Sequence, residues 1–218
     1  MKPDLDNAAL RATETLIQYN VSAAPVLPLP ILKSLAGVLV VPFAEMAARL
    51  GEDRKSLLTA FGAWNQDAVT THRDDGRIRY LVTYNQRLPF YMQQRALARE
   101  LGHIILGHDG ARPDDVRQEE AVMFARHLLC PRPMIQALQE SGLRITEEIF
   151  GNITGCYERC LAGIRKTPGV RIPPDLNRAV KAQFSDYVQN FLDCRSILTD
   201  GDDSAPADFG TSMDGYED

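Results

Sequence analysis

The feature that most constrains the fold is a pair of long helical segments that follow one another closely in the chain. The first runs from about Phe90 to Leu106 and the second from about Asp115 to Leu129. The segment between them, HDGARPDD, is short and polar, and CPRP at residues 130–133 ends the second helix because proline cannot continue one. Ala121 and Ala125 share a face of the second helix, which lets its backbone approach a neighbour closely. The sequence therefore predicts two helices packed side by side.

Strands are predicted before this helix pair. VLVVPF at residues 38–43 is a β-branched run suited to a buried strand, and RIRYLVTY at 77–84 alternates like a half-buried strand. Asp75-Gly76 favours a tight hairpin turn. Helices are predicted at 8–20, at 44–50 and through most of the chain after residue 133, where 145–166 has the size and central glycine, Gly151, of a helix-turn-helix. The expected class is α+β, with a short twisted sheet of about three strands.

Composition and charge exclude some classes of protein. The chain has 218 residues, of which 44% are hydrophobic, as in ordinary globular proteins. It lacks an apolar run of the roughly 20 residues that span a bilayer, and its first residues do not resemble a secretory signal, so we expect a cytoplasmic protein without membrane contact. Four cysteines are then expected as free thiols.

The net charge of −5 is unevenly distributed along the chain. Seven acidic residues and no basic ones lie between Asp200 and Asp218, so the remaining chain carries about +2. The acidic tail, 199–218, lacks the apolar residues for a core and is expected to be disordered. A near-neutral body argues against nucleic-acid binding.

A chemical motif lies in the first long helix, in the stretch ARELGHIILGH at residues 98–108. Zinc peptidases of the H-E-x-x-H type place two metal-binding histidines one turn apart on a helix, with a glutamate that polarises the attacking water. Glu100 and His103 fit this pattern, whereas Arg99 stands where the first histidine belongs. A third protein ligand would have to come from the second helix, where Gln118 lies one turn before Ala121 on the same face. That face continues through Ala125 and Leu128, whereas Glu119 and Glu120 are rotated off it by about 100° and 200°.

Several segments together resemble the ImmA/IrrE family of metallopeptidase-like proteins. They are APVLPLPILKSLAGVLV, RIRYLVTYN, RELGHIILGH and EEAVMFARHLLCPRPMI, and the resemblance covers roughly residues 8–135. It implies a small zincin-like α+β domain at 1–135, in which the two motif helices pack together. Residues 136–198 are then expected to form a helical C-terminal extension packed on that domain, followed by the tail.

The resemblance implies a role for each matching residue. Glu100 matches the family's catalytic glutamate and His103 its second zinc histidine, while Arg99 and Gln118 occupy the first and third ligand positions. A guanidinium is always protonated and cannot bind zinc, so two of three ligands are degenerate and no cofactor is expected unless zinc is held by a rebuilt site. Three further histidines are alternatives. His108 is expected at the helix end, about 140° around the helix from His103, so that the two could not hold one ion without distortion. His127 is expected as structural or exposed, and His72 near the hairpin.

Three functions remain open from the sequence. The residues favour a pseudopeptidase that binds a regulatory protein or peptide, such as a helix-turn-helix repressor, without cutting it. Family membership suggests an active zinc endopeptidase that cleaves a repressor-type regulator of a mobile element or stress response. The third is a DNA-binding regulator using residues 145–165. In both peptidase readings an extended segment would pair with the strand at 78–84 and contact Tyr80, Val82 and Tyr84.

A separate hypothesis concerns what Arg99 does at the position of the first zinc ligand. Removing a divalent cation from a partly buried carboxylate cluster leaves negative charge without a partner. The arginine head could take roughly the metal's place and hydrogen-bond Gln118 and a carboxylate together. The alternative is that Arg99 extends along the cleft wall to solvent.

Overall fold

The computed structural model describes residues 1–51, 53, 56, 67–73, 76–108, 113–155 and 170–200, with side chains of the last stretch described up to residue 195. In chain order the elements are α1 (Leu5–Gln18), α2 (Pro28–Ser34), β1 (Val38–Pro42), α3 (Phe43–Leu50), β2 (Ala68–His72), β3 (Tyr80–Tyr84), α5 (Phe90–Ile105), α6 (Asp114–Leu129), α7 (Arg132–Glu140), α8 (Glu147–Thr154), α10 (Pro174–Gln183) and α11 (Ser185–Asp200). The predicted α+β class is confirmed.

The strands form one mixed sheet in the order β1-β3-β2. β1 runs parallel to β3, with Val40 opposite Val82, and β2 runs antiparallel to β3, with Thr70 opposite the same residue. β3 is the central strand, which explains why Leu81, Val82 and Thr83 are all buried rather than alternating with exposed residues. The tip of the predicted hairpin, residues 74–75, lies outside the described residues.

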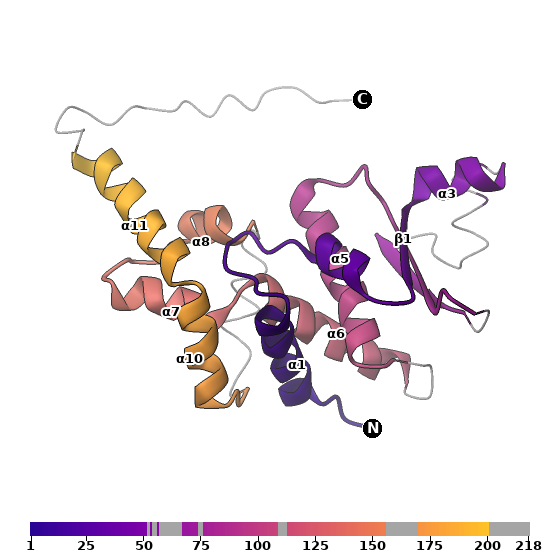
Figure 1. The fold of residues 1–218 in the computed structure, drawn as a ribbon, viewed down its shortest axis with the longest axis horizontal. Coiled ribbons are helices and arrows are strands. Elements are labelled where there is room, and N and C mark those ends of the chain that lie inside the picture. Colours follow the sequence, from indigo (N-terminus) through magenta and orange to yellow (C-terminus); the bar gives the residue numbers. More distant parts are fainter. Residues whose placement is uncertain are drawn as a thin grey trace.

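The two motif helices pack against each other, as predicted, and α5 also contacts β2 and β3. Figure 1 shows the sheet and α3 at one end of the molecule, α7, α8, α10 and α11 at the other, and α1, α5 and α6 between them. α1 lies along α6, so α6 is covered by α1 and α5 together. At the α5–α6 contact, a Cβ added to Gly102 would lie 3.0 Å from Cδ1 of Phe124. Glycine at this position therefore permits the close approach of the two helices.

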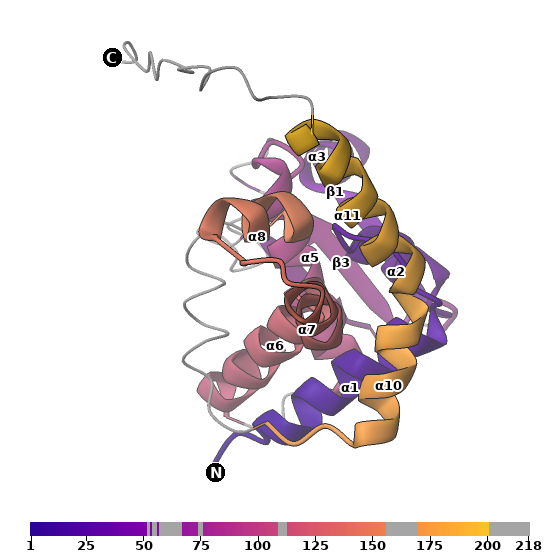
Figure 2. The same cartoon turned by 90° about the vertical axis from the view of Figure 1, so that its left-hand side faces the viewer.

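One hydrophobic core extends through most of the helical part. It joins buried side chains that come from α1, α6, α7, α8 and the junction of α10 with α11, among them Leu16, Phe124, Met134, Phe150 and Phe184. Figure 2, a view from the helical end, shows α7 in the middle of this group, with α1, α6, α8, α10 and α11 around it. The described part of the predicted C-terminal extension thus shares its core with the motif helices.

Proline-rich residues 22–30 lead directly into α2. Pro28 and Pro30 lie in the first turn of α2, with no side-chain cap before it. Backbone N–H groups of a first helical turn have no partner within the helix, so proline loses no hydrogen bond there.

Gly151 is not the turn that the helix-turn-helix hypothesis requires. It lies inside α8 and is buried, and the helix ends instead at Gly155, whose φ of +66° is the left-handed geometry that glycine favours. The second predicted helix of that pair, from residue 156 onward, lies outside the described residues, as do Cys156 and Cys160. The last predicted helix, 176–192, is divided into α10 and α11 at Phe184.

Three further expectations concern membrane-spanning helices, the cysteines and the acidic tail. None of the helices in the ranges described above is long and apolar enough to cross a membrane. Cys130 is a buried free thiol and Cys194 an exposed one. The predicted acidic tail lies outside the described residues from 201 onward, and residues 199 and 200 end α11.

The pH dependence of stability tests whether His127 is buried in the core as a neutral ring. It is buried on α6, and desolvation, followed by the charges of Arg132 and Arg126, lowers its pKa to about 4. The unfolded chain takes up this proton near pH 6.5 and the folded chain only near pH 4. The stability due to the neutral ring is therefore complete above pH 6.5 and is lost as the pH falls towards 4, by roughly 2–3 kcal/mol.

We expect urea unfolding between pH 7.5 and pH 4.5 to show this loss, and expect His127→Gln to have a shallower pH dependence than the wild type. The comparison uses the change with pH and not the absolute stability, because the substitution has its own cost at a buried position. Identical pH slopes for the two proteins would contradict a neutral, buried His127.

Candidate functional site

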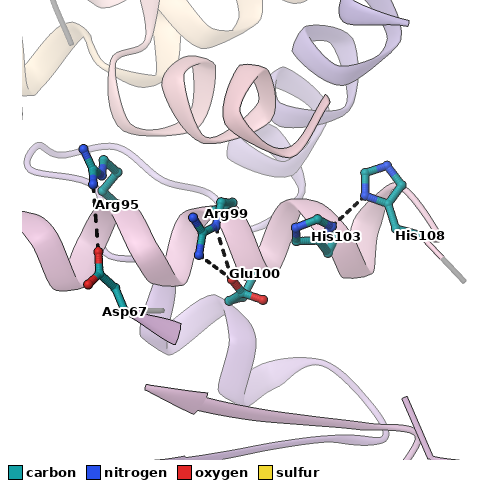
Figure 3. A network of polar contacts seen from close by, with 6 residues as sticks. All are labelled: Asp67, Arg95, Arg99, Glu100, His103 and His108. Atoms are coloured by element: carbon teal, nitrogen blue, oxygen red, sulfur yellow. Dashed lines mark hydrogen bonds and ion pairs between the residues drawn. The ribbon is translucent and has the colours of Figure 1, made fainter. Parts of the chain in front are cut away.

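The motif residues lie on successive turns of α5. Arg99 and His103 are one turn apart, and Glu100 sits beside Arg99 with its side chain 5% exposed. Figure 3 shows these three side chains along the helix, with His108 beyond its end. The local sequence accounts for the helix, because Pro89 precedes its first residue and Gly107 follows its last turn with a φ of +66°.

Arg99 forms an ion pair with Glu100. Its Nε and Nη2 atoms both donate to Oε1 of Glu100, each at 3.3 Å, and the arginine side chain is 28% exposed. The Arg99 hypothesis expected the guanidinium to contact both a carboxylate and Gln118, and this geometry agrees with the first of these two contacts. Within the described residues, Gln118, half-buried on α6, makes no hydrogen bond with Arg99, so the predicted shared contact is corrected to Glu100 alone.

Burial raises the pKa of Glu100 above its ordinary value, and the adjacent Arg99 charge and Thr70 of β2 act in the opposite direction. The Thr70 hydroxyl is buried and lies near the carboxyl group, but it makes no hydrogen bond of ordinary geometry with a described residue. The ionised form of Glu100 therefore depends chiefly on Arg99.

His103 belongs to a second polar group, which joins α5 to α6 and α1. Its Nδ1 lies 2.8 Å from Nδ1 of His108, and Nε2 of His108 lies 2.9 Å from Oε2 of Glu120. The other Glu120 oxygen, Oε1, accepts the backbone N–H of Asp4 at 2.8 Å. The side chains of His108 and Glu120 are almost completely buried.

Burial, followed by the nearby His108, Arg99 and Arg117, lowers the pKa of His103 to about 4, and Asp114 acts weakly against them. His103 is therefore neutral at pH 7. An ionised carboxylate only accepts hydrogen bonds, so we assign Nε2 of His108 as the donor to Glu120. One proton then lies between the two Nδ1 atoms, and His103 is held in a fixed orientation.

His108 lies just past the end of α5, as expected, but its predicted separation from His103 and the predicted outward position of Glu120 were wrong. His108 was placed about 140° around the helix from His103, which assumes that α5 continues to residue 108. The helix ends at Ile105 and the chain turns back at Gly107, so His108 reaches His103. Gly107 directly after an apolar run was the available signal for this turn.

Glu120 was assigned to the side of α6 away from its packed face. It is buried because α1 covers that side, and a helix enclosed by two neighbours buries more than one stripe. Ala121, Ala125 and Leu128 are buried as predicted. His72, the remaining alternative, lies at the end of β2 against the Tyr80 ring, with ring centroids 5.3 Å apart.

The proposed peptide contacts on β3 also need a correction. β3 is hydrogen-bonded to β1 on one side and to β2 on the other, so its backbone cannot receive a further strand. Val82 is completely buried, whereas Tyr80 and Tyr84 are half-buried. A role for the two tyrosines in binding can therefore only come through their side chains. In the described part of the chain, β2 is the sheet edge beside α5.

The residues present do not fit the zinc ion that the motif implies. Arg99 brings a permanent positive charge to the first ligand position, and Gln118 offers only a neutral amide at the third. Within the residues that the structure describes, no three histidine, cysteine, aspartate or glutamate side chains are grouped so that they could hold a metal ion. The arrangement can bind and orient polar groups, but its donor set is not one for zinc.

Comparison with known proteins identifies the domain. Residues 52–157 match the family described as the IrrE N-terminal-like domain, a peptidase family. This range contains β2, β3, α5, α6 and α7, so both motif helices lie inside it. The resemblance to ImmA/IrrE metallopeptidase-like proteins is confirmed. No curated protein matches the chain.

Arg99 and Glu100 should be energetically coupled. Arg99→Ala leaves a buried carboxylate without its cation, and we expect it to lower the free energy of unfolding by about 2 kcal/mol at pH 7. Arg99→Ala in a Glu100→Gln background should cost less than about 1 kcal/mol, because the buried charge is gone. Denaturant unfolding of the four proteins measures both differences.

The sign of the pH dependence follows from the raised pKa of Glu100. Loss of Arg99 raises that pKa further, so the loss of stability should be larger at pH 8 than at pH 5. Equal losses in the two backgrounds would instead identify Arg99 as a side chain that extends to solvent, independent of Glu100.

Proposed function

We propose that this chain, in which residues 52–157 form an IrrE N-terminal-like domain, is a pseudopeptidase that binds a segment of a regulatory protein without cutting it. Its zincin-like fold supplies the binding surface. Its motif helix retains Glu100 and His103 but presents a cation at the first ligand position. The proposal covers partner binding, with a helix-turn-helix repressor as the partner of first choice, and a role in the cytoplasm where such a regulator acts.

The ion pair between Arg99 and Glu100 carries this proposal. Catalysis by the H-E-x-x-H motif requires the glutamate to act on a metal-bound water. Here Nε and Nη2 of Arg99 both donate to Oε1 of that glutamate, whose carboxyl group is buried. The glutamate is therefore paired with a protein cation at the place where the chemistry of the motif requires a metal-bound water.

The edge of β2 is the best-supported place for the bound segment. Within the described residues β2 pairs with β3 only, so its outer backbone groups can accept an extended segment. Thr70 lies in the middle of this strand and next to Glu100, which places such a segment beside the motif helix. Contacts from the side chains of Tyr80 and Tyr84 remain part of the proposal.

Zinc content and proteolysis test the proposal directly. We expect the wild-type protein, dialysed against excess zinc and then freed of unbound metal, to retain far less than one equivalent by elemental analysis and to leave an unfolded substrate such as casein intact. Stoichiometric zinc that disappears in His103→Ala, together with cleavage of casein, would establish the alternative, an active zinc endopeptidase.

A repair experiment tests which residue of α6 is the third ligand position. Arg99→His restores the H-E-x-x-H motif, and we expect zinc affinity to rise markedly only when Gln118→Glu is added, since the third ligand should be anionic. Titration of zinc into the single and the double variant measures this difference. Equal affinities would show that Gln118 is not the third ligand position, and Glu120→Gln in the Arg99→His background would then test the neighbouring carboxylate.

A further inference from the structure

A second polar feature of the motif helix lies outside the catalytic positions. A pocket of about 330 Å³ is bounded by Asp67, just before β2, by α5 and by α6. Among the described residues that line it are three arginines, Arg95 and Arg99 from α5 and Arg126 from α6, and a single carboxylate, Asp67. Figure 3 shows Arg95 and Arg99 on successive turns of α5, with Asp67 facing Arg95.

The positive charge of this pocket is incompletely neutralised. Arg95 and Asp67 approach only to 3.9 Å, and the Arg95 side chain is about half exposed. Arg99 uses two of its nitrogens on a single oxygen of Glu100. Arg126 is half-buried and makes no hydrogen bond or ion pair with any residue in the described ranges. Guanidinium groups carry five donors each, so many donors around the pocket find no acceptor within the part of the chain that the structure describes.

The rest of the pocket wall is apolar. It comes from small or medium side chains of the two helices, including Val122 and Ala125, and Val122 is one of the exposed large hydrophobic residues of the protein. A ligand that fills such a pocket needs an apolar body as well as an anionic group. A bare inorganic anion would leave these walls in contact with water.

We propose that this pocket binds a carboxylate on a short apolar body. Arg126 and Arg99, from the two facing helices, hold the carboxylate oxygens, and the apolar body lies against Val122 and Ala125. Guanidinium is well suited to this task because its planar fork matches the two oxygens of a carboxylate. Arg99 is shared with the motif, whereas Arg126 and the apolar wall take no part in it, so a test on Arg126 is independent of whether the chain binds a protein segment.

The same chemistry can come from two sources. One is a free small organic acid, and the other is an acidic side chain of a bound segment. Asp67 precedes β2 directly, so a segment paired with the outer edge of β2 would pass the mouth of this pocket. In the second case the pocket would select segments with a glutamate or aspartate at one position.

Isothermal titration of the full-length protein tests the proposal with named probes. The free acids are butyrate and glutarate, and inorganic phosphate is the bare anion. The peptides are acetyl-Ala-Val-Glu-Val-Ala-amide and the same peptide with glutamine in place of glutamate. We expect butyrate, glutarate or the glutamate peptide to bind at least tenfold more tightly than phosphate or the glutamine peptide.

Arg126→Gln is the decisive variant because this side chain makes no ion pair in the described structure, so its loss should leave folding intact. We expect it to weaken carboxylate binding about tenfold, the usual effect of losing one charge-assisted hydrogen bond. Arg87→Gln, an exposed arginine outside the pocket, is the matched control and should bind as the wild type does. Thermal unfolding of both variants confirms that they fold.

The remaining outcomes each have a definite meaning. Tight binding of the glutamate peptide with weak binding of both free acids assigns the pocket to recognition of a bound segment, and the reverse assigns it to a small metabolite. Phosphate binding equal to that of glutarate, no binding by any carboxylate probe, or equal weakening by Arg126→Gln and Arg87→Gln would overturn the proposal.

Discussion

The close approach of α5 to α6 at Gly102 is the constraint on which the rest of the structure depends. Phe124 fills the space that a side chain at this position would occupy, with its Cδ1 only 3.0 Å from where a Cβ would lie. Interiors are packed without spare volume, so this contact fixes the separation of the two helices. It brings His108, beyond the end of α5, within reach of Glu120 on α6, and it places Arg99 opposite the half of α6 that bears Arg126.

Two buried carboxylates lie on this helix pair, and protein groups compensate both of them. Glu100 has the Arg99 guanidinium, and Glu120 has the His108 ring together with the backbone N–H of Asp4. Burying a charge is costly unless it is paired and hydrogen-bonded, and a metal ion is only one way to achieve this. The chain satisfies its buried acids with side-chain and backbone donors, which explains how the fold of a metallopeptidase-like domain is stable with an arginine among the motif residues.

Sequence patterns predicted the elements well where the pattern is local. Both motif helices were placed within one residue of their observed ends, because proline and glycine mark helix ends through backbone geometry alone. The strand at 80–84 was also predicted, but its central position in the sheet was not. Strand order depends on which elements meet in space, and β1 joins β3 across more than thirty-five intervening residues.

The candidate site was only partly predictable for the same reason. Glu100 and His103 follow from a motif with fixed spacing. The pairing of His108 with Glu120 depends on a turn at Gly107 and on α1 covering the outer side of α6. Periodicity along α6 alone cannot reveal a second packing partner, and it therefore indicated a single inward stripe with Glu120 outside it.

The contact between Asp4 and Glu120 has a consequence for how the domain is delimited. The match to the IrrE N-terminal-like domain begins at residue 52, yet α1, far upstream, donates a hydrogen bond to a buried acid of the site and covers α6 with Ala8, Ala9 and Leu16. The unit of homology and the unit of folding are therefore different objects in this protein. A protein fragment limited to residues 52–157 would lack α1, and the face of α6 that α1 covers would be exposed to solvent. The cooperative folding unit that holds His103 in place therefore includes α1.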